Sequence, residues 1–181
     1  MARVFGLLIL ISGFLCQVVI AQEFETKPRK YPVGMSNYKE GGNYIKVTYG
    51  RPKLRYERSL TFGYNVPYGK IWRTGADDAT EITFSQRVKL FDQELEPGTY
   101  TLFTIPDQET WTVILNSEPG QWGLYKYDPA KDVLRQEVPL YKPPKVFQEF
   151  TIHMQKSEKG VDIVVLYERI SIRLPVEFIE E

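Results

Sequence analysis

The chain has 181 residues, enough for one domain with a sizeable hydrophobic core. Its 23 basic and 23 acidic residues balance, so the overall charge does not favour binding to nucleic acid or to an anionic membrane surface. With one histidine and one cysteine, the sequence lacks the ligands of the usual zinc sites and gives little support for a hydrolase with a serine or cysteine nucleophile.

Residues 1–21 have the pattern of a secretory signal peptide. Arg3 supplies a positive charge, an apolar run covers residues 4–15, and Val19-Ile20-Ala21 forms a cleavage site before Gln22. The run is short for a transmembrane helix, and no basic cluster follows it immediately. We therefore expect an exported protein, periplasmic or extracellular, with no membrane span in its mature chain.

The lone cysteine, Cys16, suggests a lipoprotein as an alternative, in which a lipidated cysteine forms the mature N-terminus. Lipoprotein signals have a small residue immediately before the cysteine. Here that residue is Leu15, so lipidation is disfavoured. Cleavage after Ala21 removes the cysteine together with the signal. The mature chain then has no disulfide, and its stability must come from burial of a core.

The mature chain divides into a tether and a domain. Residues 22–42 are polar and irregular, which predicts a flexible tether. Residues 43–181 contain short β-branched and aromatic runs between turn signals, and no segment keeps a helical period. The runs lie at residues 44–49, 81–85, 88–90, 100–105, 111–115, 133–138, 146–152, 161–167 and 170–176. This spacing predicts a single all-β domain, an antiparallel β-sandwich, with a closed β-barrel as the alternative.

One stretch between predicted strands concentrates the chemically useful side chains. Residues 69–80 resemble neither a regular strand nor a regular helix, and they hold a large aromatic ring, a guanidinium, hydroxyls and two adjacent carboxylates. The candidate ligand-binding residues in this stretch are Trp72, Arg73, Thr74, Asp77 and Asp78. The structural alternative is a loop in which the Asp and Thr side chains bond to nearby backbone N–H groups, and Arg73 pairs with a carboxylate.

A second aromatic segment lies in the irregular stretch 116–132. A loop this long and this aromatic is commonly functional or packs across an open end of the fold. Trp122, Tyr125 and Tyr127 are able to form an aromatic platform beside the first stretch, and Trp122 joins the candidate residues. Trp111 alternates with apolar residues along a strand and is expected in the core.

Asp77 and Asp78 are the basis of two chemical alternatives. Hydrolysis of a glycosidic bond needs two carboxylates at a defined separation, whereas adjacent residues in extended backbone point apart. Calcium needs only oxygen ligands, but the spaced acidic loop of an EF-hand is absent. We therefore expect no metal and no cofactor, with calcium at Asp77 and Asp78 as the alternative, and we assign no catalytic residue.

Several motifs together resemble a known family. They are PYGKIWRTGADDAT at 67–80, PGTYTLFTIP at 97–106, WTVILN at 111–116, QWG at 121–123 and DVL at 132–134. In this order they resemble DUF2911, a family of secreted bacterial proteins of unknown function. The family pattern usually reads WRTGANEAT, so this chain has Asp77 in place of Asn and Asp78 in place of Glu. The resemblance implies an exported, mostly β domain with a shared loop motif, and it implies no catalytic residues.

The function expected from these observations is a non-enzymatic binding or structural module outside the cytoplasm. Its ligand would be a small molecule, a glycan or a peptide, and nucleic acid is not expected as a partner. The alternative is a carboxylate-dependent hydrolase acting on a glycan or a related cell-envelope polymer. The hydrolase requires Asp77 and Asp78 to converge in a cleft, whereas the binding module requires an exposed aromatic-lined surface.

Overall fold

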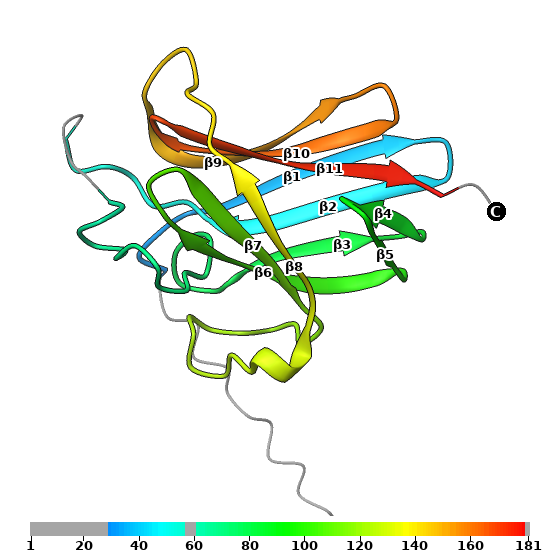
Figure 1. Ribbon diagram of the computed structural model, residues 1–181, viewed down its shortest axis with the longest axis horizontal. Helices are drawn as coiled ribbons and strands as arrows, with labels where there is room; N and C mark the ends of the chain where they lie inside the picture. Colours follow the sequence, from blue (N-terminus) through cyan, green and yellow to red (C-terminus); the bar gives the residue numbers. More distant parts are fainter. Residues whose placement is uncertain (1–28, 57–60, 180–181) are drawn as a thin grey trace, which may run out of the picture.

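The computed structural model describes residues 29–56 and 61–179, so the predicted signal peptide at 1–21 lies outside the described residues. Two antiparallel sheets face each other (Figure 1). The six-stranded sheet has the order β1-β2-β3-β6-β7-β8, and the five-stranded sheet has the order β5-β4-β11-β10-β9. The predicted antiparallel sandwich is confirmed. The barrel alternative is wrong, because the two sheets remain separate and do not close into one.

The strands follow the sequence closely from residue 43 onward. The six-stranded sheet contains β1 (Val33–Glu40), β2 (Asn43–Gly50), β3 (Thr80–Phe84), β6 (Gly98–Pro106), β7 (Thr110–Asn116) and β8 (Asp132–Pro139). The five-stranded sheet contains β4 (Val88–Leu90), β5 (Gln93–Leu95), β9 (Phe147–Lys156), β10 (Gly160–Glu168) and β11 (Ile170–Phe178). A short 3-10 helix, η1 (Pro129–Lys131), precedes β8. Among the described residues, no helix has the length and apolar character needed to cross a membrane.

The core lies between the sheets because apolar residues alternate along each strand. In β7, Trp111, Val113 and Leu115 are buried between the sheets, as the alternation predicts. They meet the inner faces of β10 and β11, where Ile163 and Leu174 are fully buried. The expectation that Trp111 belongs to the core is therefore confirmed.

Edge-to-face aromatic contacts fill part of this core. The ring of Trp72 lies 5.4 Å from Phe62 and 5.4 Å from Phe150, measured between centroids. It also meets Trp111 at 6.0 Å with the two ring planes perpendicular. Edge-to-face aromatic pairs add to the stabilisation that comes from area burial. Trp72 thus anchors residues 69–80 to the centre of the domain.

Strand β1 differs from the flexible tether expected at residues 22–42. It pairs with β2 in continuous register from Val33 opposite Gly50 to Glu40 opposite Asn43. Gly41, with φ of 58°, provides the left-handed backbone that a tight hairpin needs. The sequence hides this strand because, of its eight residues, only Gly34 is buried, so an edge strand has the polar composition of a linker.

Removal of β1 should destabilise the domain. A chain that begins at Asn43 loses the β1–β2 ladder and the hydrogen bond from Ser36 Oγ to the carbonyl of Ile152 in the other sheet. We expect its melting temperature to fall by at least about 5 °C relative to a chain that begins at Gln22. Calorimetry on both chains measures this; equal melting temperatures would show that residues 22–42 act only as a tether.

Candidate functional site

Both ends of the loop at residues 72–80 pair with the same strand, β6. Trp72 exchanges two backbone hydrogen bonds with Thr104, with N···O distances of 2.7 and 2.9 Å. Thr80 starts β3 and lies opposite Leu102, two residues earlier along β6. The ends of the loop are therefore close together, as in a compact Ω-loop, and Thr80 N donates to Arg73 O at 3.1 Å to close it.

Close backbone packing holds the middle of the 72–80 loop. A Cβ at Gly50, the last residue of β2, would lie 1.8 Å from the carbonyl oxygen of Ala76, so only glycine fits there. Thr74 and Asp77 adopt left-handed backbone with φ of 53° and 63°. Thr74 is held in this strained conformation because Thr80 Oγ1 donates to its carbonyl at 2.6 Å.

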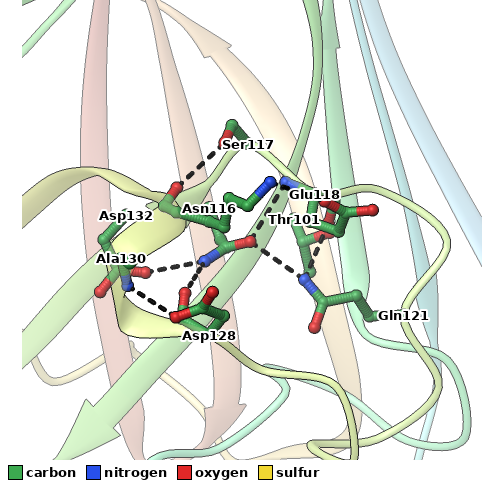
Figure 2. Close-up of polar contacts among 9 residues, drawn as sticks. Thr101, Asn116, Ser117, Glu118, Gln121, Asp128, Ala130 and Asp132 are labelled. Carbon is green, nitrogen blue, oxygen red and sulfur yellow. Dashed lines mark hydrogen bonds and ion pairs between the residues drawn. The ribbon is translucent and has the colours of Figure 1, made fainter.

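The neighbouring loop, residues 117–131, is ordered by a polar network centred on Asn116 (Figure 2). Asn116 Nδ2 donates to Asp132 Oδ1 at 2.9 Å, and Asn116 Oδ1 accepts from Glu118 N at 3.1 Å. Gln121 Nε2 donates to the same Asn116 oxygen at 3.1 Å and to Glu118 O at 2.8 Å. Since Asn116 is fully buried, these bonds replace the water that its amide would otherwise bind.

Tyr127 closes the other end of the 117–131 loop. Its ring covers Phe103 on the outer face of the six-stranded sheet, with centroids 4.9 Å apart. Its hydroxyl donates to Asp132 Oδ2 at 2.7 Å. Burial, and then the hydrogen bond to the Asp132 carboxylate, raises the pKa of Tyr127 to about 12. Tyr127 is therefore part of the packing of the loop.

Backbone pairing joins the two loops directly. Ala79 N donates to Gln121 O at 2.9 Å, and Gly123 N donates to Asp77 O at 3.0 Å. Asp78 and Trp122 are therefore directly opposite each other as a pair without mutual hydrogen bonds. In antiparallel pairing such residues have their side chains close together on one face. The Trp122 indole, which is 52% exposed, thus lies beside the Asp78 carboxylate.

The first of two cavities next to the 72–80 loop contains Arg73. Its volume is about 620 Å³. The described residues that line it include Lys53, Arg55 and Arg73 and four tyrosines, but no carboxylate. Lys53 is ion-paired with Glu149 at 3.4 Å, and the Arg55 guanidinium lies 5.9 Å from the Tyr56 ring.

Among the described residues that line this cavity, Arg73 is the cation without an ion-pair or aromatic partner. Its Nε–H is buried and donates to no acceptor within residues 29–56 and 61–179, and its guanidinium forms no ion pair there. One terminal nitrogen, Nη1, lies only 3.1 Å from where a Cβ of Gly123 would be. A buried donor without an acceptor is costly, so this arrangement calls for an explanation.

The second cavity contains Asp78 and has a volume of about 350 Å³. Its lining includes Thr48, Asp78, Glu81 and Gly120, and none of the described residues lines both this cavity and the Arg73 cavity. Arg29 also lines it and is ion-paired with Asp78. The described lining of this cavity therefore contains both donors and acceptors.

The sequence-selected residues are thus divided among different environments. Trp72 and Arg73 line the larger cavity, and Asp78 lines the smaller one with Trp122 at its side. Thr74 is completely buried and bonded to Thr104 within the protein, with the two Oγ1 atoms 3.1 Å apart.

Asp77 contacts the chain that precedes β1: its Oδ2 accepts from the backbone N–H of Tyr31 at 3.3 Å. Arg29 and Tyr31, which bind Asp78 and Asp77, lie in the stretch expected to be a tether, so the sequence analysis missed them. Lys53 and Arg55 were also missed. The run Arg51-Pro52-Lys53-Leu54-Arg55, which is basic and has no regular alternation, is the signal that could have identified them.

Within the described ranges, no group of three His, Cys, Asp or Glu side chains gathers where it could hold a metal ion. His153 lies in β9, opposite Val164, in the other sheet. Burial, and then the Arg173 charge, lowers the pKa of His153.

Truncation of Trp72 should lower the stability of the protein, whereas truncation of Trp122 should leave it nearly unchanged. Trp72→Ala removes a ring that is 7% exposed and should lower the free energy of unfolding by about 3–5 kcal/mol. Trp122→Ala, its matched control on the surface, should change that free energy by no more than about 0.5 kcal/mol. Urea unfolding measures both; a large loss in Trp122→Ala would show that the indole supports the fold.

Tyr127 should make stability depend on alkaline pH. Its folded pKa of about 12 exceeds the value of 10.0 for an unperturbed tyrosine, so the unfolded chain releases this proton first. The stabilisation is complete below pH 10 and is lost as the pH rises from about 10 to 12. Tyr127→Phe should flatten this part of the profile relative to Tyr125→Phe; identical slopes would contradict the assignment.

The comparisons with known proteins agree with the sequence motifs. Residues 32–176 match the family described as "Protein of unknown function (DUF2911)". No curated protein and no solved structure has detectable similarity to the chain. The match covers most of the chain, including β1 and both loops, and it begins after Arg29 and Tyr31, which line the two cavities. The chain therefore belongs to the DUF2911 family.

Proposed function

We propose that this protein is an exported, non-enzymatic binding module whose ligand presents an anionic group to Arg73. The observation that supports this proposal is the guanidinium of Arg73, which is unpaired among the described residues and lies in a cavity whose described lining has no carboxylate. Arginine is always charged in proteins and presents a planar set of donors that suits carboxylate and phosphate groups. A bound anion supplies the acceptors that the described residues do not.

The surroundings of Arg73 favour an anion over a cation. Lys53 and Arg55 lie in the same lining, so the local potential is positive. The carboxylate of Glu149 lies 3.4 Å from Lys53 Nζ but is shared with Arg51, at 2.8 Å, so it offsets the charge of Lys53 only in part. A positive cavity raises the local concentration of anions and strengthens their binding at the unpaired guanidinium.

The tyrosines of the cavity favour a ligand that also has a flat or apolar face. Tyr31, Tyr64 and Tyr167 line the cavity with Trp72 at its edge. Tyr64 is 80% exposed, so its ring is accessible to a ligand. Tyrosine rings give contact area at low conformational cost and offer a hydroxyl for orientation. An aromatic carboxylate, an acidic sugar or an acidic peptide has this combination of groups.

No observation favours the carboxylate-dependent hydrolase. The two carboxylates that it requires bind the chain before β1, with Tyr31 N on Asp77 and Arg29 on Asp78. Only Asp78 lines a cavity, and its charge is already balanced by Arg29. The binding module is the function that the geometry supports best.

Replacement of Arg73 separates a ligand site from a structural loop. Arg73→Met keeps the length of the side chain but removes the charge. Its free energy of unfolding should therefore equal that of the wild-type chain or exceed it by up to about 1 kcal/mol, and its melting temperature should not fall. The same variant should lose binding to anions that the wild-type chain binds. Titration calorimetry with inorganic phosphate, benzoate and tetragalacturonate measures this.

The matched control is Arg87→Met, which removes a guanidinium that is ion-paired with Glu96 at 2.9 Å outside this cavity. Its anion binding should equal that of the wild-type chain. A strong loss of stability in Arg73→Met with unchanged anion binding would contradict the proposal, as would equal binding by both variants.

A further inference from the structure

We propose that the smaller cavity, together with the exposed Trp122 indole, is a second site that binds a neutral carbohydrate. This site is separate from the anion site proposed at Arg73, because the two cavities have no described lining residue in common. It stands on different observations: the pairing of Asp78 with Trp122, and the polar lining around them.

The position of Trp122 is fixed by its backbone. The hydrogen bonds on either side of the Asp78–Trp122 pair leave those two residues opposite each other, which directs both side chains to the same face. The loop that carries Trp122 is held in place by the Asn116 network shown in Figure 2, through the neighbouring residue Gln121. An aromatic ring fixed in this way costs little entropy on binding.

The floor of the cavity is the outer face of the six-stranded sheet. Thr48 on β2 lies directly opposite Glu81 on β3, so the two side chains share that face. Glu81 Oε1 accepts from Gly120 N at 2.7 Å, which attaches the 117–131 loop to the sheet and leaves the second carboxylate oxygen for a ligand. A threonine hydroxyl and a carboxylate side by side suit a ligand with several hydroxyl groups.

Gln121 provides a further unsatisfied polar group at this cavity. It is 3% exposed and lines the cavity. Its Nε2 is committed to Asn116 and Glu118, and its Oε1, on the side of the amide away from Asn116 in Figure 2, has no hydrogen-bond partner among the described residues. The polar wall of the cavity is therefore not fully satisfied by the protein itself.

The charges favour a neutral ligand over a cation. Arg29 neutralises Asp78 and repels a bound cation, and the remaining carboxylate of the described lining, that of Glu81, is an acceptor for ligand hydroxyls. Donors and acceptors near an exposed indole suit a sugar ring, whose hydroxyls both donate and accept and whose C–H face packs on an aromatic surface.

The test is titration of the mature chain with three neutral tetrasaccharides: cellotetraose, maltotetraose and tetra-N-acetylglucosamine. The chain has three tryptophans, and Trp72 and Trp111 are 7% and 1% exposed, so a change in tryptophan emission reports mainly on Trp122. We expect at least one sugar to change the emission and to release heat at concentrations up to about 5 mM.

Trp122→Ala should remove the emission change and weaken binding by about tenfold or more, and Glu81→Gln should weaken it by about threefold to tenfold. Arg73→Met and Tyr64→Ala, which alter the other cavity, should leave sugar binding unchanged. Loss of sugar binding in those two variants would overturn the separation of the sites.

Three other results would overturn the assignment. They are the absence of any response to all three sugars, a response that persists in Trp122→Ala, and a response to tetralysine or to phosphatidylcholine–phosphatidylglycerol vesicles in place of the sugars. The last result would assign Trp122 to a cationic peptide or to a membrane surface. Trp122→Ala is expected to fold normally, and its unchanged melting temperature checks this.

Discussion

The arrangement of the site depends on one constraint, the closure of the 72–80 loop on β6. Paired backbone hydrogen bonds with Thr104 fix the start of the loop, and Gly50 lets its middle approach the end of β2. With both ends and the middle fixed, the backbone of the loop sets the direction of each side chain. Trp72 enters the core, Arg73 faces one cavity, and Asp78 faces the other. The polar and aromatic side chains of this stretch are therefore distributed between two cavities that share no lining residue within 29–56 and 61–179.

The departure of this chain from the family pattern has a backbone explanation at Asp77. This residue has φ of 63°, a conformation that asparagine and aspartate adopt more readily than most other residues. Its side chain accepts a hydrogen bond from Tyr31 N, which an asparagine carbonyl oxygen does equally well. Both requirements are satisfied by the Asn of the family pattern and by Asp77. At Asp78 the carboxylate is retained, and it pairs with Arg29.

Much of the fold was predictable because period-two alternation is local information. Apart from the short strand β5, the strands of residues 43–178 and the burial of Trp111 follow from it. Strand β1 was not predictable, since an edge strand with one buried residue has the composition of a linker. The residue types of the site were recognised, but their grouping was not. The pairing of Asp78 with Trp122, and of Arg29 with Asp78, joins positions far apart in the chain that no local pattern relates.

The central claim is that the guanidinium of Arg73, which has no partner among residues 29–56 and 61–179, binds an anion. Side-chain ¹⁵N–¹H NMR of the arginine Nε groups, during titration with tetragalacturonate, tests it most directly. The account predicts that one Nε–H signal, absent from the Arg73→Met spectrum, shifts as the ligand is added, while the signal of Arg87, paired with Glu96, stays in place. An Arg73 signal that does not move for tetragalacturonate, benzoate or phosphate would contradict it.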